Sequence, residues 1–142
     1  MDQLKRLLLG QLNLQLKNLQ AKCIGFVIMP DHVHAIVWFA QIGQLSQFMQ
    51  VWKRDSSRSI GVWYQSQQVE YLKNTSMEDR LWTPKYYAFQ IYSTEKLVEK
   101  LEYMHQNPVR AELVERATDR KWSSVRWYDS RRSVGVPISW ID

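Results

Sequence analysis

Residues 23–39 read CIGFVIMPDHVHAIVWF and hold two of the three histidines in the chain. The run 23–29 is short and apolar, which is typical of a buried strand. The run 32–39 is rich in β-branched and aromatic residues and predicts a second strand. Pro30 and Asp31 between the two runs are a turn signal. We therefore expect residues 23–39 to form a β-hairpin.

Helical periodicity flanks this hairpin on both sides. Leucines at regular spacing predict an amphipathic helix over residues 2–20, and a second apolar stripe predicts a helix over 44–60. Ser93 is a good N-cap for a third helix, which Pro108 should end near residue 107. The order of segments is α-β-β-α-β-α, where the last strand is the aromatic, extended stretch 81–91. This order predicts one α+β domain over residues 1–142, with a basic, aromatic tail from about residue 118.

Composition narrows the class of protein. A chain of 142 residues has the length of one domain, and its single cysteine excludes an intramolecular disulfide and a multi-cysteine zinc site. No run approaches the roughly 20 apolar residues that span a bilayer, so we expect a soluble, cytoplasmic protein without membrane contact. The net charge is +5, and there are seven Trp and seven Tyr. Basic side chains bind phosphate and rings stack on unpaired bases, which favours nucleic acid as the partner; rings that simply pack the core are the alternative.

Two histidines lie two residues apart in the second predicted strand. Residues at this spacing point to the same face of a sheet, so His32 and His34 should lie side by side while Val33 points into the packing on the other face. Such a pair can hold one divalent metal ion. The spacing alone also permits a chance pair with a structural role.

The third predicted helix carries a polar flank beside its apolar stripe. Lys96, Lys100, Tyr103 and Asn107 fall on this flank at about 100° per residue. Two lysines can hold a phosphate and favour the phenolate of the tyrosine, whose ordinary pKa of about 10 makes it a weak nucleophile. Asn107 lies one turn beyond Tyr103, so both side chains can reach one point. The alternative is a solvated flank with a surface tyrosine; His105, on the opposite flank, is expected to pack or form a hydrogen bond.

Four blocks carry a resemblance to a known family. Residues 27–34 (VIMPDHVH) resemble the HUH motif of the single-strand DNA transposases. Residues 103–110 (YMHQNPVR) resemble the tyrosine helix of the REP-associated tyrosine transposase branch of that family. Residues 81–87 and 122–126 resemble two further blocks in the same order, and a lysine common in the family has its match in Lys53. The resemblance covers roughly residues 21 to 128.

The resemblance implies a fold and a reaction. The fold is a ferredoxin-like antiparallel sheet with helices on one face, here apparently without the first strand of the family. The reaction is metal-dependent cleavage and rejoining of single-stranded DNA beside a hairpin, in which Tyr103 forms a 5′-phosphotyrosine and frees a 3′-hydroxyl. The metal is Mg or Mn, held by His32, His34 and Asn107. The partner is single-stranded or hairpin DNA, and the protein is a monomer or a homodimer. We expect the DNA contacts to come from Lys53, Lys85, Lys96, Lys100, Arg110 and Arg126.

Two departures from the family pattern keep other functions open. The chain enters directly into a helix where relatives begin with a strand, which predicts exposed sheet edges and low stability or self-association. Ala88 and Phe89 stand where relatives carry an acidic residue and a histidine. Both departures favour a catalytically inactive, nucleic-acid-binding remnant of the same fold. A metal hydrolase that uses the two histidines and water, with a structural Tyr103, is a third reading.

Overall fold

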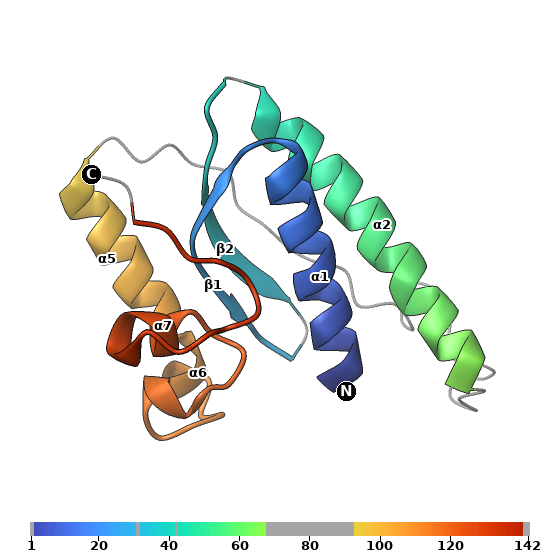
Figure 1. Cartoon of the computed structure of the whole chain (residues 1–142). Coiled ribbons are helices and arrows are strands. Elements are labelled where there is room, and N and C mark those ends of the chain that lie inside the picture. The colour runs from blue at the N-terminus through green and yellow to red at the C-terminus, as the bar shows by residue number, and fades with distance from the viewer. Residues whose placement is uncertain (1, 31, 42, 68–92, 141–142) are drawn as a thin grey trace.

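Figure 1 shows the computed structural model, which describes residues 2–30, 32–41, 43–67 and 93–140. The elements, in chain order, are α1 (Asp2–Asn18), β1 (Lys22–Ile28), β2 (Val33–Trp38), α2 (Gln44–Gln67), α5 (Thr94–His105), α6 (Asn107–Arg110), the 3-10 turn η1 (Ala117–Asp119) and α7 (Val125–Ser130). The α+β class and the three predicted helices are confirmed, although α2 continues past residue 60, its predicted end. The strand predicted over 81–91 lies outside the described residues.

The predicted hairpin is confirmed as an antiparallel pair. His34 lies opposite Val27, and Val33 lies opposite Ile28. The turn is closed by the Met29 amide, which donates to the carbonyl oxygen of His32 at 2.8 Å. A bulge between Cys23 and Gly25 shifts the register at the start of β1, and bulges of this kind increase the local twist of a strand.

Helices pack on both faces of the hairpin, not on one face as the sequence led us to expect. On one face, Phe26 and Ile28 pack with Leu12 of α1 and Trp52 of α2. On the other face, residues of α5 close a second cluster, formed by Val27, Met29, Leu101 and Met104. The reason is that β1 is buried at every position from Cys23 to Ile28, so both of its faces are apolar and both need a cover.

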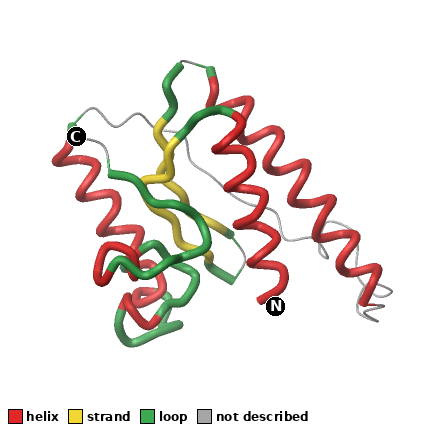
Figure 2. The backbone as a smooth tube through the Cα atoms, viewed as in Figure 1, coloured by secondary structure: helices red, strands yellow, loops and turns green. Residues whose placement is uncertain are grey.

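The segment after α6 covers the outer edge of β1. The Ile28 amide donates to the carbonyl oxygen of Trp122 at 2.8 Å, and the Ser124 amide donates to the carbonyl oxygen of Phe26 at 2.9 Å. Farther along, the Ser139 amide donates to the carbonyl oxygen of Cys23 at 2.9 Å, and Figure 2 shows this loop running beside the strand. The predicted tail is therefore part of the core. It protects the edge of β1 that does not pair with β2.

Candidate active site

The helix that carries Tyr103 is built as the sequence predicts. The Ser93 hydroxyl oxygen accepts a hydrogen bond from the Lys96 amide at 3.2 Å and caps α5. Leu97, Leu101 and Met104 form the buried stripe that faces the hairpin. The helix ends at His105, and the short α6 follows with Pro108 in its first turn. This packing leaves the polar flank of α5 toward solvent.

Tyr103 lies on that flank, and its side chain is 63% exposed. The guanidinium carbon of Arg110 lies 3.7 Å from the centroid of the tyrosine ring. The same guanidinium donates to the carbonyl oxygen of Tyr103 at 2.5 Å and to the Oδ1 of Asn107. Because α6 turns the chain back within four residues, Arg110 contacts both Tyr103 and Asn107. These are the two residues whose side chains the sequence predicts to lie close together. The sequence reading assigned Arg110 to DNA and missed this link.

The two histidines meet as their spacing predicts. Their Nε2 atoms are 2.9 Å apart, and the ring centroids are 4.7 Å apart at an interplanar angle of 82°. Val33, between them, is buried on the opposite face with the α1 and α2 cluster. Burial lowers the pKa of His34 below its ordinary value of 6.5, and the charges of His32 and Arg110 lower it further. Two imidazole nitrogen atoms that converge in this way can act as ligands of one cation.

The histidine strand and the tyrosine helix face each other. His34 lies directly opposite Val27 in the hairpin, and residues opposite each other in an antiparallel pair project to the same face. Val27 packs against Leu101 and Met104 of α5. His34 therefore projects to the α5 side of the sheet, where Arg110 acts on its pKa. The fold thus brings one histidine, Arg110 and the tyrosine helix to one side of the hairpin.

The histidine pair fits a divalent metal as two ligands of a larger set. In the described part of the chain, no three side chains of His, Cys, Asp or Glu group as metal ligands. The resemblance to the transposases matches the third ligand to the carboxamide of Asn107. Its oxygen accepts a hydrogen bond from Arg110 in this structure, and its second lone pair is the one that a metal ion would use.

The lysines predicted to bind DNA are distributed over three segments. Lys96 and Lys100 are exposed on α5, and the Nζ of Lys96 lies 3.2 Å from a carboxylate oxygen of Glu99. Lys53 lies on α2, and Lys85 lies outside the described residues, as do Ala88 and Phe89. The structure therefore brings the two α5 lysines onto the helix of Tyr103 and gives no position for the side chains of the other two.

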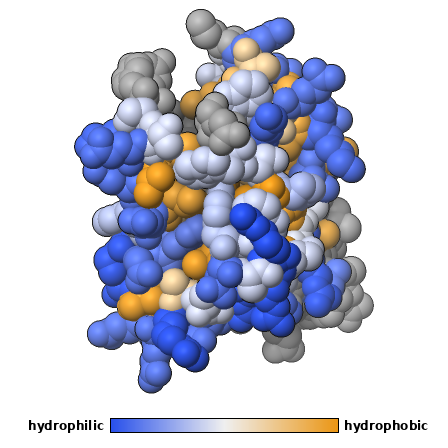
Figure 3. All heavy atoms as spheres, turned by 60° about the vertical axis from the view of Figure 1, so that its left-hand side comes forward, coloured by the Kyte–Doolittle hydropathy of each residue, from blue (hydrophilic) through white to orange (hydrophobic). Residues whose placement is uncertain are grey.

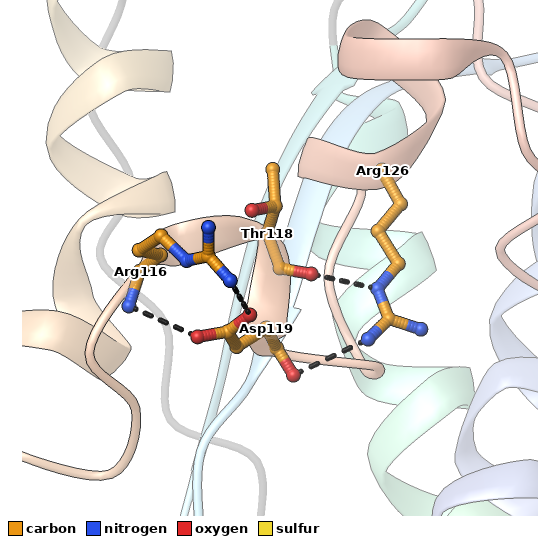
Figure 4. Close-up of polar contacts among 4 residues, drawn as sticks. All are labelled: Arg116, Thr118, Asp119 and Arg126. Atoms are coloured by element: carbon orange, nitrogen blue, oxygen red, sulfur yellow. Dashed lines mark hydrogen bonds and ion pairs between the residues drawn. The ribbon is translucent and has the colours of Figure 1, made fainter.

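Arg126 and the aromatic residues around it hold the C-terminal segment together. The Nε of Arg126 donates to the carbonyl oxygen of Thr118 at 2.9 Å, and its Nη2 donates to that of Asp119 at 3.3 Å (Figure 4). The carboxylate of Asp119 in turn pairs with Arg116 at 3.6 Å. Trp122 is buried, so its ring packs in the core. For this residue, core packing and not base stacking is the role that the structure supports. Arg126 was predicted to bind DNA; here it fixes the turn at residues 117–119.

The expectation for His105 is confirmed. Its side chain is buried, and its Nε2 lies 2.6 Å from the Oγ of Ser124. Burial lowers the pKa of His105 to about 4, so the imidazole is neutral at physiological pH. Ser124 is a residue whose role the sequence reading missed; the one signal available was its place in the block 122–126.

Comparison with known proteins agrees with this geometry. The profile of the family described as "Transposase IS200 like" matches residues 3–107, which is more than half of the chain. The chain belongs to the IS200-like transposase family. No match was found among curated proteins or among solved structures. None of the described helices is long and apolar enough to cross a membrane.

Proposed function

We propose that this transposase cleaves and rejoins single-stranded DNA beside a hairpin through a 5′-phosphotyrosine on Tyr103. We also propose that it belongs to the REP-associated tyrosine branch of its family. The observation that carries the proposal is the juxtaposition of an exposed tyrosine, a guanidinium on its ring and a pair of histidines on the same side of the hairpin. The sequence blocks 27–34 and 103–110 support the choice of branch.

In the proposed reaction the Oη of Tyr103 attacks the phosphorus of one phosphodiester. A bond forms between Oη and phosphorus, and the bond between phosphorus and the 3′ oxygen breaks. The phenolic proton passes to solvent, and the 3′ oxygen takes up a proton and leaves as a hydroxyl. Rejoining is the reverse step, in which a 3′-hydroxyl attacks the phosphotyrosine, so the energy of the phosphodiester is conserved and no nucleotide triphosphate is needed.

Arg110 and two lysines supply positive charge beside Tyr103 in the proposed reaction. The Arg110 guanidinium, 3.7 Å from the ring centroid, and the cations of Lys96 and Lys100 along the same flank attract the phosphate to the tyrosine. His32 and His34, with Asn107, would hold Mg or Mn, which when bound would polarise the phosphodiester. Imidazole pairs bind Mg and Mn more weakly than Zn, Ni or Cu.

The test is covalent capture. Incubating the protein with Mn and a labelled DNA hairpin that has a single-stranded flank should give an adduct that survives a denaturing gel. Tyr103→Phe removes one exposed oxygen and should abolish the adduct while DNA binding is nearly unchanged. Tyr92→Phe, a tyrosine just before the cap of α5, is the matched control and should keep the adduct. An adduct that persists in Tyr103→Phe would refute the assignment of the nucleophile.

A catalytically inactive, DNA-binding member of the family is the second candidate. One feature of the sequence favours it: Ala88 and Phe89 stand where the resemblance to the family places an acidic residue and a histidine. This candidate predicts DNA binding by the wild type without an adduct on any of several hairpins. Calorimetric titration with Mn separates the two further, since an inactive member without a metal site would give the same curve as His32→Ala/His34→Ala.

A further inference from the structure

A basic hollow of about 450 Å³ lies between α1 and the C-terminal segment. Four cationic side chains line it: Arg6 from α1, and Lys121, Arg126 and Arg132 from the C-terminal segment. No acidic side chain is among the described residues that line it. Residues 121–135 lie beyond the stretch that matches the family profile, which ends at residue 107. The hollow is thus a feature that the family match does not account for.

The four cationic side chains of the hollow differ in their exposure. Arg126 is half-buried and fixed from behind by the carbonyl oxygens of Thr118 and Asp119 (Figure 4), whereas Arg6, Lys121 and Arg132 are exposed at the rim. Several cations around one concave surface raise the local concentration of anions. The lining therefore selects a ligand that carries more than one negative charge.

The wall of the hollow is a fixed turn of backbone. Arg131 ends α7 in the left-handed conformation, with φ of 59°, and turns the chain back so that the Arg132 amide donates to the carbonyl oxygen of Arg126 at 3.4 Å. Gly135 has φ of 93°, and a Cβ at that position would lie 3.0 Å from the Cδ1 of Leu9 on α1. Val134 beside it is buried in the core. These contacts hold the segment that carries Arg132 against the helix that carries Arg6.

The lining also indicates which part of a nucleic acid it can contact. Among the described residues of the lining, the one aromatic residue is Trp122, which is only 8% exposed. The Nζ of Lys5 lies 5.9 Å from its ring, and that of Lys121 lies 5.0 Å from it. A buried ring flanked by two ammonium groups cannot stack on a base, so the hollow offers charge without a stacking platform. Most of the face shown in Figure 3 is hydrophilic, with apolar side chains in separate patches. Backbone phosphates are the ligand that this chemistry fits.

We propose that this hollow binds the phosphate backbone of DNA as a second site, apart from Tyr103. Leu9, Trp122 and Val134 of its lining belong to the core cluster on the α1 side of the hairpin, whereas the tyrosine helix packs on the other side. The two sites would therefore hold different parts of one DNA molecule. The site rests on the family's DNA partner and does not require Tyr103 to react.

The test compares two charge-matched double variants of the full chain. Arg6→Gln/Arg132→Gln removes two rim cations of the hollow, and Lys17→Gln/Arg58→Gln removes two exposed cations elsewhere on α1 and α2. Fluorescence anisotropy with a labelled DNA hairpin is recorded over a range of salt concentrations. We expect the hollow variant to bind about ten-fold more weakly at low salt, with the slope of log affinity against log salt shallower by about two, because each lost phosphate contact removes about one counterion.

Further arms make the outcome decisive. Arg6→Lys/Arg132→Lys keeps both charges and should recover most of the affinity, and a hairpin of changed stem sequence should bind equally. An equal loss in the control variant, or displacement of the DNA by inorganic phosphate well below the ionic strength of the buffer, would overturn the proposal. Adduct formation at saturating DNA is measured in parallel. A wild type that forms no adduct, while Arg6→Gln/Arg132→Gln still loses affinity, would refute the reaction on Tyr103 and support the hollow.

Discussion

Gly25 is a position of β1 that side chains of the tyrosine helix approach closely, and we predict that Gly25→Ala destabilises the protein. A Cβ at Gly25 would lie 2.5 Å from the Cδ1 of Leu101, 3.0 Å from the Cε of Met104 and 3.0 Å from the Oγ of Ser124. Met104 is flexible and can yield, but Ser124 is held by hydrogen bonds to Phe26. Ser124 thus leaves the new Cβ no room on its side, and the Leu101 side chain, 2.5 Å away, must shift away from the strand.

The magnitude follows from two opposing effects. Overpacking of a close-packed core costs about 1–3 kcal/mol. Replacing glycine by alanine recovers about 0.4–1 kcal/mol by restricting the unfolded chain, since Gly25 does not have a left-handed φ. The net loss in the free energy of unfolding should be about 1–2 kcal/mol. For a chain of this length that corresponds to a fall in Tm of about 3–7 °C.

Urea unfolding followed by circular dichroism measures the effect. Gly10→Ala is the matched control, because Gly10 is an exposed position of α1 where a Cβ would meet nothing within 4 Å. That variant should gain up to about 1 kcal/mol from helix propensity. If Gly25→Ala were as stable as the wild type, or gained as much as Gly10→Ala, the close contact between α5 and β1 would be refuted.

Two further predictions concern titration. The pKa of His105 is about 4 in the folded protein against an ordinary value of 6.5, so the unfolded chain binds more protons between these values, and stability should fall by up to about 3 kcal/mol as the pH drops from about 6.5 to 4. Urea midpoints over this range should show that fall in the wild type and a flatter profile in His105→Gln; parallel profiles would contradict it. Arg110→Gln should raise the pKa of His34 toward its ordinary value, because the guanidinium charge is one of the causes that lower it. An NMR titration of the His34 imidazole measures this pKa, which the control variant Arg116→Gln should leave unchanged. A pKa of His34 that does not rise in Arg110→Gln would refute the proximity of Arg110 to the histidines.

The features that sequence patterns predicted correctly are those that depend on residues close together in the chain. The hairpin, the cap at Ser93, the break at Pro108 and the exposure of Tyr103 all follow from periodicity and from single residues with strong conformational preferences. The contact between His32 and His34 follows from the two-residue repeat of a strand. Each of these features needs only a few neighbouring residues, so sequence reasoning could reach them.

The hydrogen-bond partners of charged side chains, and contacts between segments far apart in the chain, were out of reach of the same reasoning. The sequence predicts that Arg110 and Arg126 are exposed cations. In the structure, Arg126 donates to carbonyl oxygens of η1, and Arg110 donates to Tyr103 and Asn107. The edge pairing of Trp122 with Ile28 joins residues 94 positions apart in the chain (122 − 28 = 94). Neither hydrophobic periodicity nor charge reports such partners, because the guanidinium makes equally good hydrogen bonds to phosphate and to backbone carbonyls.

Ser124 explains how a segment beyond the family match fixes the candidate active site. Its Oγ accepts a hydrogen bond from the Phe26 amide at 3.0 Å, lies 3.2 Å from the Phe26 carbonyl oxygen, and lies 2.6 Å from the Nε2 of His105. A hydroxyl has one proton to donate and two lone pairs to accept with. All three contacts are satisfied together if the hydroxyl donates to the carbonyl oxygen and His105 is the neutral tautomer with its proton on Nε2. Protonating His105 would add no partner to this set, in agreement with its low pKa. One buried hydroxyl therefore joins the histidine hairpin to His105, the last residue of the tyrosine helix, so Ser124 helps to hold the helix that carries Tyr103 against the hairpin.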